Sequence, residues 1–378
     1  MSKKILFTLL VTLNLYSYSQ DCITRSVVVG KKNNKTIDTI RTKIISLIEN
    51  YNKVFFDETI DFSKYWTGKA IQEYAIPDNL LRLELSTYQL PKYKYQLDII
   101  NLFKKDDYWI ARIGFNVFNK DSSFLGLLDV YDFGIINQNN SYKFFPLIEK
   151  YSFVESSNNS FSLYCENDTK LIKISIDSME CYVKYLNNFF DFSLPKFRCY
   201  YFNKNSNINE AIGFIIREAD PSQTNERYDA SNKIIYVLNY HNFKHELVHS
   251  FLVEKFGGNC HNWFNEGCAT FLAGSGDYNL NQHLTILANH LIKHPEFNLN
   301  NILDYRGFII DKETSYKYTV SGLICKLVYQ KHGKKGLYQL LNFGSSDLDF
   351  YISIQSLLGI KKENLNAFLR AEIYKYLI

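Results

Sequence analysis

The sequence predicts an α+β fold with two domains: an N-terminal helix plus antiparallel sheet, then a small mixed sheet with a mainly helical C-terminal lobe. Apolar residues in the stretch 36–60 recur with the period of a helix. Between residues 93 and 145, apolar and polar residues alternate with the two-residue period of a strand. From residue 279 onward the helical spacing returns. A length of 378 residues with 46% hydrophobic residues is sufficient for two cores.

Residues 1–20 have the composition of a secretory signal peptide. Two lysines form a charged start, and residues 5–15 form an apolar run that is too short to span a bilayer comfortably. The segment Ser17–Ser19 offers small residues for cleavage near Gln20. We therefore expect an exported mature protein, periplasmic or extracellular, with no membrane segment after signal removal. An uncleaved membrane anchor is the alternative for this stretch.

The overall composition bears on partners and on cysteine chemistry. The formal net charge is only +4, so nothing indicates a nucleic-acid partner. The seven cysteines are odd in number and irregularly spaced, and no Cys-x-x-Cys pair is present. Buried free thiols are therefore expected for most of them, with a disulfide between Cys260 and Cys268 as the alternative. The sequence gives no indication of the oligomeric state.

The first domain, residues 21–160, is predicted to contain one helix followed by antiparallel strands. After Pro77 the helical period gives way to alternation, and polar turns separate the alternating stretches. The predicted strands are Leu81–Leu85, Tyr93–Ile99, Tyr108–Phe118, Leu127–Phe133 and Tyr142–Phe145. This layout resembles a cystatin-like or nuclear-transport-factor-like sheet. Its acids and bases are scattered, which indicates a role in packing, substrate positioning or partner binding.

The second domain, residues 161–378, begins after the small and polar stretch Ser156–Ser160. Its first part combines a helix at Leu171–Phe190 with short strands, and the remainder is helical. The predicted strands are Phe197–Phe202, Ala211–Ile216 and Asn232–Leu238. The predicted helices of the C-terminal lobe are Asn279–Lys293, Ser315–Lys331, Lys334–Leu341, Leu348–Leu358 and Lys362–Leu377.

One short segment combines metal-ligand spacing with a proton acceptor: His245-Glu246-Leu247-Val248-His249. Residues four apart on a helix project from the same face, so the two imidazoles can meet on one ion. Glu246 lies beside the open side of that ion. Two neutral imidazoles to hold the metal and a carboxylate to accept a proton are what a hydrolytic zinc site requires. An ordinary amphipathic helix is the alternative for so short a match.

A third protein ligand is expected from the next helix start. Glu266 lies where a following antiparallel helix could deliver its carboxylate to the ion held by His245 and His249. Here the sequence resembles the gluzincin metallopeptidases, whose pattern is H-E-x-x-H, a turn, and a Glu in a W-x-x-E-G-x-A context. The matching residues are Trp263, Glu266, Gly267 and Ala269. A helix N-terminal acid favoured by the macrodipole is the alternative for Glu266.

The resemblance implies a zincin-like second domain with one zinc ion per chain, bound by His245, His249 and Glu266. It also implies that Glu246 acts as the general base when water attacks a peptide carbonyl. An oxyanion partner is expected from the helical lobe, with Tyr318 as the candidate and Tyr316 as the fallback.

The resemblance further implies that Lys233–Asn239, just before the metal-binding helix, is the edge strand of the sheet. An extended peptide or protein substrate would then bind to it by strand addition. Thr270 follows Glu266 by one helical turn, and it either orients a ligating histidine or packs in the core. The remaining histidines lack ligand spacing and are expected on the surface or in loops: His241, His261, His283, His290, His294 and His332.

The sequence departs from the family at one place. Gluzincin aminopeptidases carry a Gly-x-Met-Glu-Asn stretch that captures the free amine of the substrate, and Ser178-Met179-Glu180-Cys181 does not fit it. An endopeptidase is therefore favoured. Two other functions remain open. One is a binding protein on an inactive peptidase scaffold, with the aromatic first domain carrying the function; the other is a zinc hydrolase of non-peptide substrates.

Overall fold

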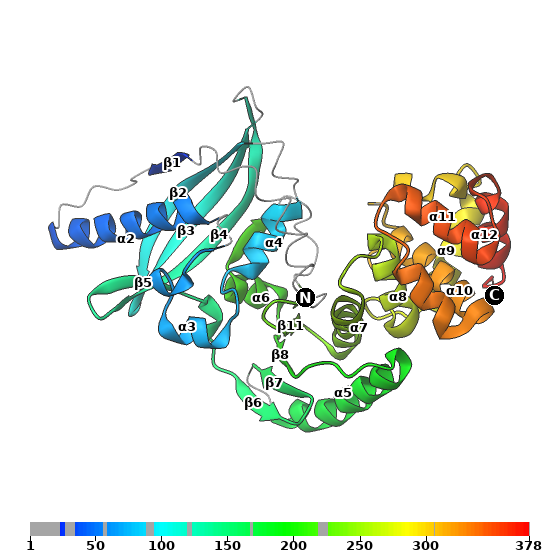
Figure 1. The fold of residues 1–378 in the computed structure, drawn as a ribbon, viewed down its shortest axis with the longest axis horizontal. Helices are drawn as coiled ribbons and strands as arrows, with labels where there is room; N and C mark the ends of the chain where they lie inside the picture. The colour runs from blue at the N-terminus through cyan, green and yellow to red at the C-terminus, as the bar shows by residue number, and fades with distance from the viewer. Residues whose placement is uncertain are drawn as a thin grey trace. The chain divides into compact units, whose positions relative to one another are not determined.

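The computed structural model describes residues 23–26, 35–55, 59–87, 94–118, 123–166, 169–217, 226–305 and 307–377. The chain forms two compact units (Figure 1). The first unit contains the residues up to Phe153 together with Asn203–Asn225, and the second unit contains Val154–Phe202 and Glu226 onward. The division therefore falls seven residues before the predicted boundary at residue 160, and the first unit includes a segment from the predicted second domain. The predicted signal peptide lies outside the described residues.

The first unit is built on a six-stranded sheet with the strand order β1-β2-β3-β4-β5, in which β9 also pairs with β4. All neighbouring strands are antiparallel except β1 and β2, which are parallel. The strands are β1 (Ile23–Ser26), β2 (Lys94–Lys105), β3 (Tyr108–Phe118), β4 (Phe124–Gln138), β5 (Ser141–Phe145) and β9 (Phe214–Arg217). The helices are α2 (Lys35–Val54), α3 (Gly68–Glu73), α4 (Asn79–Thr87) and α6 (Asn205–Ile212), with short 3₁₀ turns η1 (Phe62–Lys64) and η3 (Leu147–Lys150).

Two predicted strands of this unit are wrong in part or in whole. Leu81–Leu85 belongs to the helix α4, in which Leu81 is buried while Leu83 is exposed. The carboxylate of Asp78, just before α4, accepts hydrogen bonds from Arg82 Nε (2.8 Å) and from the Tyr51 hydroxyl (2.6 Å), which ties α4 to α2. The predicted strand Ala211–Ile216 is split, because the end of α6 occupies its first residues before β9 begins.

The second unit begins with a five-stranded mixed sheet with the order β10-β11-β8-β7-β6. The three central strands are parallel, and both edge strands are antiparallel to their neighbours. The strands are β6 (Val154–Ser157), β7 (Phe161–Cys165), β8 (Phe197–Tyr201), β10 (Arg227–Asp229) and β11 (Ile234–Val237). The prediction that Lys233–Asn239 forms the edge strand is therefore wrong: β10 covers that side of β11. A strand of three residues, such as β10, is too short to show the alternation of apolar and polar residues that predicts a strand.

Helices make up the rest of the second unit, as predicted. They are α5 (Thr169–Phe190), α7 (Tyr240–Phe256), α8 (Asn262–Ala273), α9 (Leu280–Lys293), α10 (Tyr316–Leu341), α11 (Asp347–Leu358) and α12 (Leu365–Tyr374), with 3₁₀ segments η4 (Leu299–Tyr305) and η5 (Lys362–Asn364). The two helices predicted on either side of Gly333 are joined in α10, which kinks there. An α+β protein with an antiparallel sheet, a mixed sheet and a helical C-terminal region is thus confirmed.

Helix α7 lies between the mixed sheet and the C-terminal helices (Figure 1). The side chain of Asn239 caps its first turn by accepting a hydrogen bond from the Asn242 N–H (2.8 Å), and Gly257 ends it with φ = 73°. The apolar face of α7 is completely buried: Phe243 stacks on Phe197 of β8, and Phe251 on Phe190 of α5. This packing fixes the rotation of α7 and hence the direction in which its polar residues point.

Candidate metal centre

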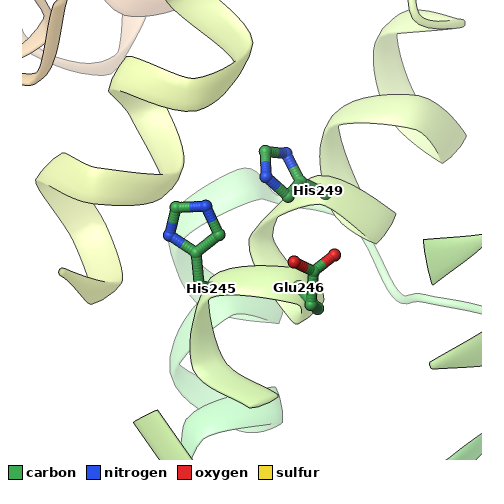
Figure 2. Close-up of side chains that lie close together, drawn as sticks. All are labelled: His245, Glu246 and His249. Atoms are coloured by element: carbon green, nitrogen blue, oxygen red, sulfur yellow. The ribbon is translucent and has the colours of Figure 1, made fainter. Parts of the chain in front are cut away.

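The two histidines of α7 project from the same side of the helix, with the carboxylate of Glu246 beside them (Figure 2). Their ring centroids are 4.8 Å apart. One ligand atom from each of His245, Glu246 and His249 can be chosen so that all three lie within 4.8 Å of one another. Both imidazoles are largely shielded from solvent, with exposed side-chain fractions of 9% for His245 and 15% for His249. The helical spacing thus produces the convergence expected from the sequence.

Glu266 on α8 brings its carboxylate close to both imidazoles. Its Oε2 atom lies 3.4 Å from His245 Nε2 and 3.3 Å from His249 Nε2. Zinc ligands at about 2.0–2.2 Å in a tetrahedral arrangement are about 3.3–3.5 Å from one another. Glu266 Oε2 therefore lies from each imidazole nitrogen at the separation of two ligands on one zinc ion.

The charges at this centre favour a bound cation. Burial alone would lower the pKa of His249, but the carboxylate of Glu266 outweighs it and raises that pKa to about 9. Burial would likewise raise the pKa of Glu266, but the two histidines and Lys317 hold it well below its usual range. A buried anion between two imidazoles attracts positive charge, which is supplied by a proton in the metal-free protein and can be supplied by a metal ion.

Each imidazole is oriented by a hydrogen bond at its other ring nitrogen. His245 Nδ1 donates to the backbone carbonyl of Gly274 (2.7 Å), and His249 Nδ1 donates to the side-chain Oδ1 of Asn265 (3.1 Å). Because both acceptors are oxygens, these bonds place a hydrogen on Nδ1 and make Nε2 the nitrogen that would bind a metal. The hypothesis that Thr270 orients a histidine is wrong: its hydroxyl donates to the carbonyl of Glu266 in its own helix.

Helix α10 contributes two further side chains beside Glu266. The ring of Tyr318 stacks on His245 with a centroid distance of 5.8 Å. The charge of Glu266, together with burial, raises the pKa of Tyr318 well above its usual value, so its hydroxyl stays protonated at neutral pH. Lys317 Nζ lies 3.8 Å from Glu266 Oε1, the carboxylate oxygen that does not face the histidines.

Close packing of α8 on α10 brings these residues together. A β-carbon at Gly267 would lie 2.5 Å from the carbonyl carbon of Ser321, so only glycine allows this approach.

Tyr316, the fallback candidate for the oxyanion partner, is one position before Lys317 in the sequence but is completely buried against Trp263 and Tyr305. It is a core residue, and Tyr318 is the tyrosine that lies at the centre.

The residues that support the ligands carry no signal in the sequence. Asn265 and Lys317 adjoin Glu266 and Tyr318 in the sequence, but neither has a spacing that marks a role. The expectation of surface or loop positions is wrong for His283, whereas His261 does lie in the loop before α8, as its N-cap. His261 is buried and its Nδ1 accepts a hydrogen bond from the Trp263 N–H at the start of α8. His283 is buried on α9.

The cysteines around the centre are not bridged. Cys260 and Cys268 both carry free thiols, as do the other cysteines in the described part of the chain, so the alternative of a disulfide between them is not present. Burial raises the pKa of Cys260 to about 11, which makes it an unreactive thiol at neutral pH.

No protein-family model matches the sequence, and no similar curated protein was found. The likeness to gluzincins therefore rests on the residues of α7 and α8. Within the described ranges, no helix combines the length and the apolar character needed to cross a membrane.

Proposed function

We propose that this chain is an exported zinc-dependent peptidase, in which His245, His249 and Glu266 bind one zinc ion. The observation that carries the proposal is the convergence of two Nε2 atoms and one carboxylate oxygen at 3.3–3.4 Å. Glu246 adds a carboxylate beside this donor set, as a hydrolytic site requires. Export depends on residues 1–20 and is part of the proposal.

The chemistry divides between the metal and the side chains. When bound, zinc would polarise the peptide carbonyl and make water more acidic. Glu246 accepts the proton of the attacking water and then delivers it to the leaving amine. Asn265 and the Gly274 carbonyl hold the histidines in the tautomer that presents Nε2. The positive charge of Lys317 offsets the negative charge on Oε1 of Glu266, the carboxylate oxygen that does not face the histidines.

Tyr318 is the proposed oxyanion partner. Its raised pKa keeps the hydroxyl as a hydrogen-bond donor across the neutral range. Its ring stacks on His245, so the hydroxyl moves little relative to the ligands. A donor held in advance where negative charge develops stabilises the transition state without reorganising at the moment of reaction.

An endopeptidase is favoured over an amino-terminal exopeptidase. Such an exopeptidase needs an acidic group that holds the free amine of the substrate. Met179 is buried in α5, and the carboxylate of Glu180 pairs with Lys184 on the same helix (2.8 Å). Met179 is thus part of the core of the second unit, and the carboxylate of Glu180 is paired within its own helix.

The test uses the full mature chain with and without zinc. Metal analysis should find about one zinc per chain, and a peptide library or casein should be cleaved at internal bonds. A chelator should stop cleavage, and added zinc should restore it. In Glu246→Gln, cleavage should fall by at least about 100-fold, because the proton acceptor is lost while the metal ligands remain.

The zinc content of Glu246→Gln is the matched control, since loss of zinc would indicate a damaged centre. If zinc binds but no peptide is cleaved, a zinc hydrolase of another substrate becomes the better proposal. If the wild type binds no zinc, the enzyme proposal fails and a binding protein on a peptidase-like scaffold replaces it.

A further inference from the structure

The turn between α8 and α9, residues 274–279, carries the acceptor that orients His245. This segment, the 274–279 loop, closes on itself through two backbone hydrogen bonds between Ser275 and Tyr278, at 3.0 and 3.2 Å. Gly274 adopts φ = 84°, and a β-carbon there would lie 2.3 Å from the Tyr278 carbonyl oxygen. The loop conformation therefore requires glycine at this position, and it aims the Gly274 carbonyl at His245 Nδ1.

A buried histidine on α9 holds this loop from the far side. His283 Nε2 donates to the carbonyl of Ser275 (3.0 Å), the residue next to Gly274. Its Nδ1 accepts a hydrogen bond from the hydroxyl of Thr314 (3.1 Å). Thr314 is itself fixed, because its N–H donates to Asp311 Oδ1 (2.7 Å). A neutral imidazole has one donor and one acceptor, and both are used here.

The ring of His283 also packs edge-to-face on Tyr278, with a centroid distance of 5.6 Å. The loop is thus held both by a hydrogen bond to Ser275 and by a contact with its last aromatic residue. A carbonyl in a loop has no helix or sheet to fix its direction, so it needs such support to act as a directional acceptor.

We propose that His283 is a positioning residue for the metal ligand His245: it fixes the 274–279 loop, and the Gly274 carbonyl of that loop sets the direction of the His245 imidazole. The proposal rests on the proposed metal centre, and it attributes part of the rigidity of that centre to helix α9. His283 lacks the spacing of a metal ligand, and the proposal explains why it is nevertheless buried beside the loop.

The test compares three variants of the full chain. His283→Leu removes both hydrogen bonds, whereas His283→Gln keeps an amide N–H that can reach the Ser275 carbonyl. His290→Leu is the matched control, because His290 lies on the same helix and its ring packs against His294, Phe297 and Phe308. Zinc affinity, measured by competition with a chelator, should fall about 10–100-fold in His283→Leu. In His283→Gln and His290→Leu it should stay close to the wild-type value.

A second measurement does not depend on zinc. In metal-free protein labelled with ¹⁵N-histidine, the Nδ1–H resonance of His245 reports its hydrogen bond to Gly274. That resonance should shift or exchange faster in His283→Leu but not in His290→Leu. Because the resonance is recorded in metal-free protein, the measurement tests the positioning role of His283 even if the wild type does not bind zinc.

An unchanged His245 resonance and an unchanged zinc affinity in a folded His283→Leu would overturn the proposal. Should that variant not fold, Thr314→Val replaces it. That substitution removes the hydroxyl that holds the His283 ring while keeping the side-chain shape, and a smaller change in the same direction is expected. No change in Thr314→Val would equally overturn the proposal.

Discussion

His249 changes its charge with pH when no metal is bound. Its pKa of about 9 in the folded protein lies above the value of about 6.5 expected for an unfolded chain. When folding raises the pKa of a group, its protonated form stabilises the fold. This stabilisation is complete at a pH below the pKa in the unfolded chain, and it is lost as the pH rises through the pKa in the folded protein. The metal-free protein should therefore lose stability between about pH 6.5 and 9.

Thermal unfolding of metal-free wild type and His249→Gln across this range checks the prediction. The melting temperature of the wild type should fall more steeply with pH than that of the variant. Parallel curves for the two proteins would show that the His249–Glu266 pair does not titrate in this range. Zinc affinity should change in the opposite direction and increase up to about pH 9, since zinc binds neutral imidazole.

The side chains of the centre differ in how far the sequence could predict them. His245, Glu246 and His249 lie within two helical turns, so the helical period alone places them. Glu266 could be expected because the turn after α7 is short and a new helix begins at once. The Gly274 carbonyl could not be expected, because every residue has a carbonyl and only the loop conformation selects this one.

At the scale of elements, the contact between α8 and α10 depends on Gly267. In Gly267→Ala, the new methyl group would meet backbone atoms of Ser321, which cannot rotate away. Overpacking of this kind costs about 1–3 kcal/mol and outweighs the gain of up to about 1 kcal/mol from helix propensity. We expect a net loss of unfolding free energy and a weaker zinc site, measured by chemical denaturation and chelator competition.

Gly68→Ala on α3 is the control for this substitution. A β-carbon at Gly68 would meet no atom within 4 Å, so its stability should be unchanged or slightly higher. Equal effects of the two substitutions would mean that the backbones of α8 and α10 can separate without cost.

The elements with a long repeating pattern were predictable, and the short ones were not. Helices α5 and α9 have apolar residues gathered along one side over several turns, which gives a clear helical period. The alternation at Leu81–Leu85 spans five residues, too few to separate a strand from a helix with one apolar side. There the pairing of Asp78 with Arg82 and Tyr51 favours the helix. Strand β10 is defined by its pairing with β11 and not by its own residues.

At the scale of the whole molecule, the units are not consecutive along the chain. Residues 203–225 leave the second unit after β8 and join the first, where β9 pairs with β4. Ile208, Ala211 and Phe214 of this segment are buried. A fragment that starts at Val154 should therefore expose apolar side chains and an unpaired strand, and we expect it to aggregate.

The same fragment with residues 203–225 replaced by a flexible Gly-Ser linker of about ten residues should be soluble. It should still bind zinc, because all residues of the candidate metal centre belong to the second unit. Size-exclusion chromatography and metal analysis of the two fragments check this. Equal insolubility of both would show that the second unit needs more than its own residues to fold.

The pairing of β9 with β4 also bears on proteolytic maturation. A single cut between Phe153 and Val154 would divide the chain into two pieces, yet the carboxy-terminal piece would still supply a strand to the sheet of the other. The two products would stay associated through backbone hydrogen bonds. An amino-terminal half that acted as a removable inhibitor would therefore need a second cleavage near residues 218–225, or a step that peels β9 away, before it could diffuse off.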